Sequence, residues 1–187
     1  MISARETAFA LSGALRLARM DPGGLGHFDT SIAGFWRSFY AAVVVAPAYV
    51  LLIAFDAALR PVGAGPMRWV LVDGIAYVIE WTAYPLAMVY IARWLACGDN
   101  YIRYIVAHNW ANVLGIALFL PVAAIAVLNP AMAGLLYLAM IAVFVYQWYV
   151  ARTALEITGG EAAVLMVFNL VLSFFISVVA GVMLHRS

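Results

Sequence analysis

Five long apolar segments follow one another along this chain, and they restrict what it can fold into. They run from about Trp36 to Leu59, Arg68 to Cys97, Tyr101 to Leu128, Ala131 to Ile157 and Glu161 to His185. A helix needs about 20 mostly apolar residues to cross the hydrocarbon core of a bilayer. Each segment reaches that length. Only 10% of the residues are charged, where a soluble domain carries about 25%. The sequence therefore predicts an all-α, polytopic membrane protein.

Short turns join these segments, so we expect one five-helix transmembrane domain over residues 31–187, preceded by a cytoplasmic helix and loop over residues 1–30. Asn129-Pro130 makes a tight turn because proline cannot continue the preceding helix. Gly159-Gly160 is expected to end the fourth segment. At Gly98-Asp99-Asn100, the glycine is free to leave the helix, and Asp99 or Asn100 is placed to cap the next one.

An amphipathic helix is predicted over Ile2–Met20, and Asp21-Pro22-Gly23-Gly24 ends it. At about 100° per residue, one narrow arc of this helix carries Arg5, Ser12, Arg16 and Arg19, and a neighbouring apolar arc carries Ala4, Ala8, Leu11 and Leu15. Two arrangements are open. The helix lies on the membrane surface, with its arginines facing anionic lipid headgroups, or it packs on the bundle.

The distribution of arginine predicts how the chain is threaded. One side of the predicted bundle receives Arg5, Arg16, Arg19, Arg37, Arg93, Arg103 and Arg152, and the other receives Arg60, Arg68 and Arg186. Positive charges near helix ends favour the cytoplasmic side. We therefore expect a multi-pass protein of the bacterial inner membrane, with a cytoplasmic N-terminus and a periplasmic C-terminus.

Polar side chains inside a span are costly and are candidates for function. Glu80 lies near the middle of the second segment. It is either a proton-relay or substrate-binding carboxylate, or a structural carboxylate hydrogen-bonded to Asn112, a tyrosine or the backbone. Arg93, His108 and Asn112 are expected to form a polar layer at similar depth, since His108 and Asn112 share a helix face. That layer is either a lined path or a set of interhelical hydrogen bonds.

Two further patterns bear on function. Pro47, Pro85 and Pro121 place one proline in each of the first three spans, as in transporters with broken helices, although proline is common in membrane helices. Ser173, Ser177 and Gly181 form a stripe of small residues that allows close helix approach, either inside the bundle, which we prefer, or in a homodimer.

Several functions are disfavoured by what the sequence lacks. It contains no HExxH, GxSxG or phosphate-binding glycine loop, and one cysteine with three scattered histidines offers no metal cluster. We expect neither an enzyme nor a cofactor or metal. A net charge of +1 gives no electrostatic case for nucleic acid.

The stretch "YIARWLACGDNYIRYIVAHNW" joins a basic, aromatic helix end to a glycine-centred turn and a helix bearing Tyr and Arg. Together with five spans and the layout of the termini, it resembles the bacterial membrane proteins of the Yip1-domain family over about residues 30–185. The Asp-Leu-Tyr-Gly-Pro signature of the eukaryotic family is missing, so small-GTPase binding is not carried over.

The resemblance implies a non-enzymatic protein that acts in membrane organisation or as a scaffold that binds a protein partner. Its contact surfaces would be the helix with Arg5, Arg16 and Arg19, and the cytoplasmic turn with Asp99, Asn100 and Arg103. The alternative is a small transporter or permease subunit, with Glu80 as the coupling carboxylate and with His108 and Asn112 lining the path.

Overall fold

The computed structural model describes residues 3–59 and 65–185, and in this part of the chain the regular structure is helical throughout. In chain order the elements are α1 (Ala4–Ala18), η1 (Pro22–His27), α2 (Ile32–Ser38), α3 (Tyr40–Leu59), α4 (Pro66–Trp94), η2 (Gly98–Asn100), α5 (Tyr101–Leu128), η3 (Pro130–Met132), α6 (Gly134–Leu155) and α7 (Gly159–His185). Among the described residues, five helical stretches are long and apolar enough to cross a membrane. The predicted all-α, five-span architecture with an N-terminal helix is therefore confirmed.

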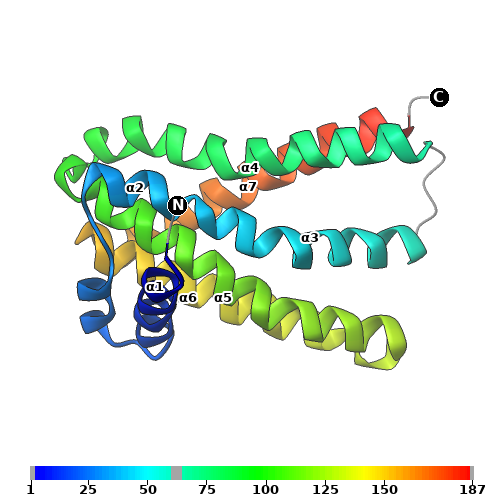
Figure 1. Cartoon of the computed structure of the whole chain (residues 1–187), viewed down its shortest axis with the longest axis horizontal. Coiled ribbons are helices and arrows are strands. Elements are labelled where there is room, and N and C mark those ends of the chain that lie inside the picture. Colours follow the sequence, from blue (N-terminus) through cyan, green and yellow to red (C-terminus); the bar gives the residue numbers. More distant parts are fainter. Residues whose placement is uncertain (1–2, 60–64, 186–187) are drawn as a thin grey trace.

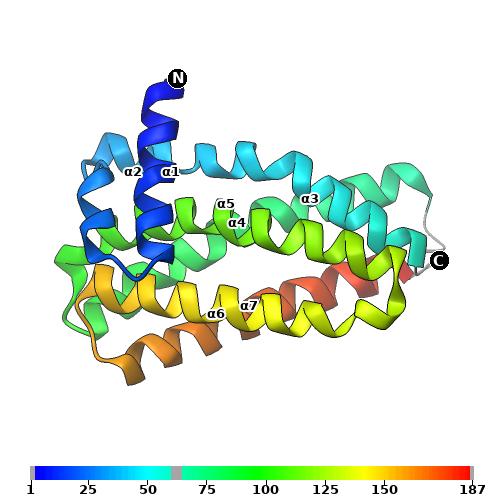
Figure 2. The same cartoon turned by 90° about the horizontal axis from the view of Figure 1, so that it is seen from below.

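α5 is the central helix of the bundle. It packs against α3, α6, α1 and α2, whereas α4 packs mainly against α7. Figure 1 shows α4 and α7 diverging from α3 and α5 towards the end of the bundle where α7 finishes. α1 runs across the long helices near the opposite end (Figure 2).

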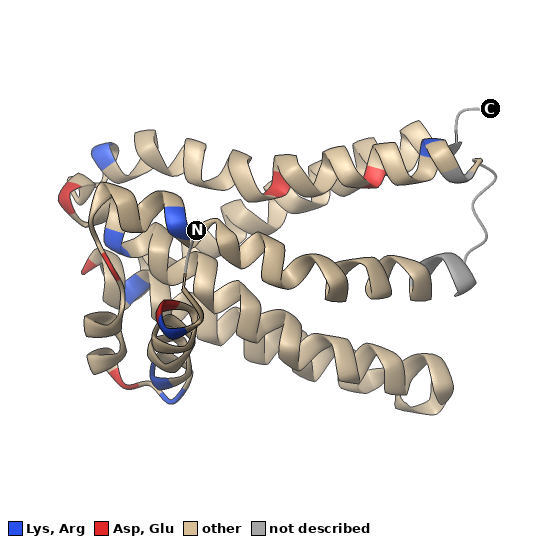
Figure 3. Cartoon of the chain, in the orientation of Figure 1, with Lys and Arg blue, Asp and Glu red and all other residues tan. Residues whose placement is uncertain are grey.

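Charged residues gather at the end of the bundle that carries α1 and η2 (Figure 3). We call this the arginine end, and the opposite end the far end. Within the spans, the two acidic residues of α4 are Asp73 and Glu80. Arg68 lies in the first turn of α4, at the far end. Arg60 and Arg186, the other two arginines assigned to that side, lie outside the described residues.

α1 packs on the bundle, which is the second of the two arrangements that the sequence left open. Its buried face consists of Ala10, Gly13, Ala14 and Leu17. Two tyrosines of α6 hold it in place: the Tyr146 hydroxyl donates to the Ala14 carbonyl (2.8 Å), and the Tyr149 hydroxyl donates to the Met20 carbonyl (2.7 Å). Members of the predicted apolar arc, including Ala4, Ala8 and Leu15, remain exposed.

Arg37 of α2 ties the start of α1 to the loop before α2. Its guanidinium donates to the Glu6 carboxylate (2.9 Å) and to the Asp29 carboxylate. Hydrogen bonds from the backbone and hydroxyl of Ser3, with the nearby Arg37, hold the pKa of Glu6 below its ordinary value. Hydrogen bonds from Ser31 and Arg37 likewise lower the pKa of Asp29. Both carboxylates therefore stay charged at neutral pH and remain available to Arg37.

The first span is interrupted, which the sequence did not predict. It begins at Ile32 rather than Trp36, and α2 and α3 are separate helices that meet at Phe39. Next to the break, the Asn109 amide of α5 donates to Ser38 Oγ (2.8 Å), which itself donates to the Phe35 carbonyl (2.7 Å). The local apolar pattern could not reveal this break, because it coincides with a contact to a distant helix.

The junction of α6 and α7 differs from the prediction. Glu156, with φ of 60°, ends α6, and α7 begins at Gly159. Thr158 and Glu161 form a capping box: Thr158 N–H donates to the Glu161 carboxylate (2.8 Å), and Glu161 N–H donates to Thr158 Oγ1 (3.3 Å). Gly159 and Gly160 therefore start α7, and their predicted role in ending the fourth segment is wrong.

The turn between α4 and α5 also differs from the prediction in the residues that end α4 and precede α5. Ala96, with φ of 55°, is the left-handed residue that ends α4, and no described glycine has a positive φ. Asn100 precedes α5 without capping it; its amide instead donates to the Leu155 carbonyl of α6 (3.1 Å). The predicted roles of Gly98 as the helix-leaving residue and of Asp99 or Asn100 as the cap are wrong.

Buried side chains are distributed unevenly along the bundle. The main cluster joins α1, α5, the start of α7 and the arginine-end halves of α4 and α6. A small second cluster joins only α4 and α7 near the far end, through Val72, Ala76, Ile176, Ala180 and Leu184. The arginine end is thus packed as a core, whereas the far end presents mostly apolar surface suited to lipid.

Candidate functional site

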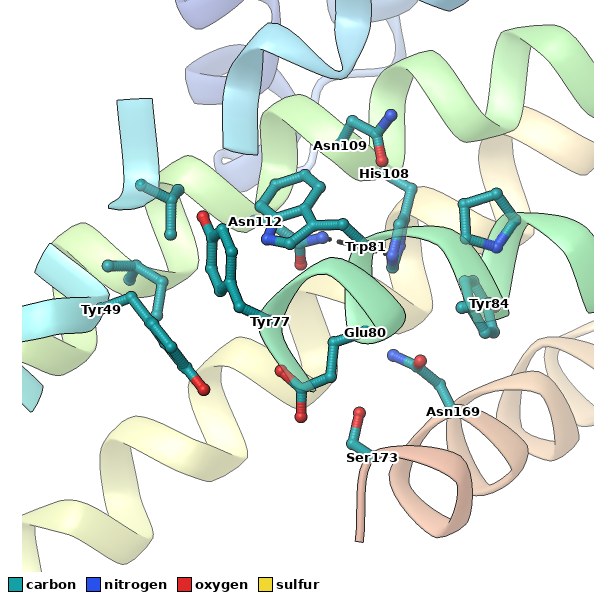
Figure 4. A pocket seen from close by; sticks show the side chains of 13 residues that line it. Tyr49, Tyr77, Glu80, Trp81, Tyr84, His108, Asn109, Asn112, Asn169 and Ser173 are labelled. Atoms are coloured by element: carbon teal, nitrogen blue, oxygen red, sulfur yellow. Dashed lines mark hydrogen bonds between the residues drawn. The ribbon is translucent and has the colours of Figure 1, made fainter. Parts of the chain in front are cut away.

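A polar cavity of about 180 Å³ lies where the α4–α7 pair meets α3 and α5 (Figure 4). Its walls come from four helices of the bundle. The lining residues are Val45, Tyr49, Tyr77, Glu80, Trp81, Tyr84, Pro85, His108, Asn109, Asn112, Ile116, Asn169 and Ser173. We call this the polar cavity. Polar groups from helices far apart in the sequence are thus brought together at the middle of the membrane-spanning region.

Glu80 is the one carboxylic acid among the residues that line this cavity. Its side chain is partly buried, and Figure 4 shows its carboxylate on the same side of α4 as the side chains of Asn169 and Ser173 from α7. Within the described chain its carboxylate forms no hydrogen bond or ion pair, and the predicted bond from Asn112 is not formed. The structure therefore leaves the Glu80 carboxylate available to a ligand, a proton or water.

A chain of amides and an imidazole crosses the bundle beside Glu80. Gln147 of α6 donates to Asn112 Oδ1 (2.7 Å), and Asn112 Nδ2 lies 3.3 Å from His108 Nε2. The predicted pairing of His108 and Asn112 on one helix face is confirmed. His108 is only 4% exposed, and its Nδ1, like Gln147 Oε1, has no partner among the described residues. The side chains of His108 and Gln147 nevertheless interact with each other, so Gln147 contacts both Asn112 and His108.

Aromatic side chains surround the carboxylate and the imidazole. Tyr49 of α3 and Tyr77 of α4 lie with ring centroids 4.5 Å apart, and the Tyr77 hydroxyl donates to the Ala42 carbonyl (2.6 Å). Deeper towards the arginine end, the Tyr84 and Tyr104 hydroxyl oxygens are 2.5 Å apart, and both rings contact His108. These bonds fix the rings in place, so the cavity wall is preorganised.

Arg93, the fourth residue of the predicted polar layer, is not part of this site. It is exposed in the last turn of α4 and does not line the polar cavity. Tyr84 of α4 pairs with Tyr104 of α5, so these two residues lie at the same depth. Arg93 lies nine residues, or about 13 Å, beyond Tyr84 towards the arginine end, whereas His108 lies beyond Tyr104 in the opposite direction. The equal depth expected for Arg93 and His108 is therefore wrong.

The remaining predicted contact residues all lie at the arginine end. Arg5, Arg16 and Arg19 are exposed on α1, and Arg16 forms an ion pair with Asp21 (2.6 Å). In the turn, Asp99 is exposed, whereas Arg103 donates to the Ala154 carbonyl and to Glu156 (2.8 Å each). Arg103 thus stabilises the end of α6. Its pairing also helps to lower the pKa of Glu156.

Several lining residues were not predicted. Tyr77 and Tyr84 lie three residues before and four residues after Glu80, so they share its helix face, and Trp81 is at helical spacing from both tyrosines; this signal was present in the sequence. Gln147 does not line the polar cavity but donates to Asn112, and it was visible as a single amide within an apolar span. Tyr49 gave no such signal, because only the packing of α3 on α5 brings it to the cavity.

The proline pattern agrees with its ordinary interpretation, whereas the small-residue stripe does not have the preferred outcome. α3, α4 and α5 continue as helices through Pro47, Pro85 and Pro121, so these prolines do not break them. Ser173 lines the polar cavity, but Ser177 is exposed and a Cβ added at Gly181 would meet nothing within 4 Å. The small-residue stripe therefore does not mediate close packing inside the described bundle.

Comparison with family models, curated proteins and solved structures finds no match to this chain.

Proposed function

We propose that this protein binds a small solute at the polar cavity and works as a small transporter or permease subunit rather than as an enzyme. The observation that carries the proposal is the convergence of Glu80, His108, Asn112, Asn169 and Ser173, from three helices, on one cavity. Polar residues at membrane depth are costly and mark solute or ion pathways. A solute that paired with Glu80 would offset that cost.

The proposed setting is a bacterial inner membrane with the arginine end in the cytoplasm. The support is the arginine bias: seven of the ten arginines fall at that end, and Arg68 begins α4 at the other. With this orientation the N-terminus is cytoplasmic and the C-terminus is periplasmic. A solute would then cross between the α4–α7 pair and the helices α3 and α5.

Access to the cavity from both sides of the membrane tests the transport proposal. The chain has a single cysteine, so Cys97→Ala gives a cysteine-free background. Burial raises the pKa of the Cys97 thiol, which makes it a poor target in any case. We expect Ser173→Cys to react with a charged, membrane-impermeant methanethiosulfonate reagent in spheroplasts and also in inverted vesicles, measured by mass spectrometry.

Ser177→Cys is the matched control, because Ser177 lies one turn further along α7, is exposed and does not line the cavity. A lipid-facing thiol is hidden from a charged reagent, so we expect no reaction there. Labelling of Ser173→Cys from one side only, from neither side, or at the same rate as Ser177→Cys would each overturn the transport proposal.

A second function, the Yip1-like role in membrane organisation, is favoured by the outer face of α1. One face of α1 packs on α5 and α6. The arc with Arg5, Arg16 and Arg19 stays exposed, and so do the apolar residues Ala4, Ala8 and Leu15. α1 contacts α6 at Tyr146 and Tyr149, six or more residues before α6 ends. That position corresponds to about 10 Å from the helix end. An amphipathic helix at this depth suits the headgroup region.

Anionic lipid retention tests this second function. We expect the Arg5→Gln, Arg16→Gln, Arg19→Gln triple variant to lose bound phosphatidylglycerol, by about 1 kcal/mol for each arginine at the surface. The measurement is native mass spectrometry of protein released from mixed phosphatidylglycerol and phosphatidylcholine nanodiscs. Arg68→Gln, at the far end, is the control and should retain the lipid. Equal retention by the triple variant would contradict a lipid-binding role for α1.

A further inference from the structure

A second, mostly apolar cavity adjoins the polar cavity. This second cavity has a volume of about 340 Å³ and lies between α5, α6 and α7. Asn112, Ile116, Asn169 and Ser173 line both cavities, so these side chains stand at the boundary between the two spaces. Away from this junction, the apolar cavity is lined mainly by Phe119, Met140, Val143, Phe144, Met166 and Leu170, with Gln147 as its one further polar side chain. A molecule that extends across the boundary must therefore be polar at one end and largely hydrocarbon-like at the other.

The charge at the polar end favours a cation. Of the described residues that line the two cavities, Glu80 is the one carboxylic acid, and no arginine or lysine joins it. An unpaired carboxylate in an apolar surrounding needs a countercharge or a proton. Rings of Tyr49, Tyr77, Trp81 and Tyr84 surround this end, and aromatic faces attract ammonium groups. A phosphate or carboxylate headgroup would instead meet repulsion from Glu80.

We infer that the solute is an amphipathic amine, bound with its ammonium group at Glu80 and its hydrocarbon substituent in the apolar cavity. This inference rests on the proposed function, since both use the polar cavity. The junction residues Asn112, Asn169 and Ser173 sit where the polar and apolar parts of the ligand join and can accept hydrogen bonds from the ammonium group. When the amine leaves, a proton can take its place on Glu80 and keep the charge balanced.

Isothermal titration of the protein in lipid nanodiscs tests this ligand class, with empty nanodiscs subtracted for partitioning. The probes are n-octylammonium, methylammonium, n-octanol and octanoate. We expect octylammonium to bind at least about tenfold more tightly than each of the other three, which is about 1.4 kcal/mol. It alone offers both the charge and the hydrocarbon chain.

The variants Glu80→Gln and Asp73→Asn form a matched pair, because each removes one carboxylate from α4 but Asp73 does not line either cavity. We expect Glu80→Gln to weaken octylammonium binding about tenfold or more and Asp73→Asn to leave it within about twofold. Unchanged binding in Glu80→Gln, or octanoate binding as well as octylammonium, would overturn the inference.

The two proposals fail in different ways. Methylammonium binding as tightly as octylammonium would overturn the amphipathic ligand, while labelling of Ser173→Cys from both sides would still support transport of a small solute. The absence of labelling from either side, with octylammonium still bound through Glu80, would overturn transport and leave a lipophilic amine site.

Discussion

Replacing Gly24 by alanine is expected to separate α1 from the bundle. A Cβ at this position would lie 2.4 Å from the Gly13 carbonyl oxygen and 3.0 Å from the Leu17 backbone nitrogen. Both are backbone atoms of α1, so no side-chain rotation relieves the clash. Because η1 and α1 must then move apart, the buried contacts of Ala14 and Leu17 are lost. We expect a destabilisation of about 3 kcal/mol, at the upper end of the usual cost of overpacking.

Hydrogen exchange in micelles checks this expectation, since the amides of α1 should lose protection while those of α5 keep it. Gly26→Ala is the control within the same short helix. A Cβ at Gly26 would meet nothing within 4 Å, and its φ is not positive. Alanine there should be neutral or slightly stabilising, because it restricts the unfolded chain. If both variants protect α1 as the native protein does, the close approach of Gly13 and Gly24 is not needed for docking.

Replacing Trp110 by alanine is expected to destabilise the arginine end by about 3–5 kcal/mol, the usual range for removing a buried tryptophan. Trp110 is 2% exposed and is the largest of the fully buried side chains. It belongs to the same buried cluster as Ala10 of α1 and Phe28, and with them, Phe9 and Ser38 it lines a cavity of about 90 Å³. The indole thus borders the space in which three separate segments meet α5, and alanine would enlarge that space.

Denaturation of the purified protein in mixed micelles measures this cost, with helical circular dichroism as the signal. Trp94→Ala is the comparison, because Trp94 is 84% exposed at the end of α4 and fills no such space. We expect Trp94→Ala to change the unfolding free energy by less than about 0.5 kcal/mol. Similar costs for the two variants would show that Trp110 does not hold these segments together.

The sequence predicts the spans well because bilayer thickness alone sets their length. The predicted third segment, Tyr101 to Leu128, has the bounds of α5. Helix ends that depend on local hydrogen bonding are harder to predict from the sequence. The Thr158–Glu161 capping box is visible in the sequence as T-x-x-E, but the two glycines within it also fit the end of the previous helix. Nothing local marked Ala96 as the residue that would leave α4.

The candidate site was predicted in part. Glu80, His108 and Asn112 do line one cavity, because a polar residue within a span tends to face other helices. Helix lengths alone place Arg93 at the wrong depth, because the pairing of Tyr84 with Tyr104 fixes the axial offset between α4 and α5. That offset depends on how side chains of the two helices fit together, and the apolar pattern of a single helix does not encode it.

The uneven core has a mechanical consequence. With most buried side chains at the arginine end, the α4–α7 pair and the α3–α5–α6 group are joined firmly there, and α4 and α7 are held to each other by the small second cluster. A rotation of one group against the other about that joined end acts as a lever: displacements are small near Tyr84 and grow with distance towards Trp69. Glu80 lies between these two residues on α4. The same rotation that widens the far end therefore changes the shape of the polar cavity while the α1 end stays in place.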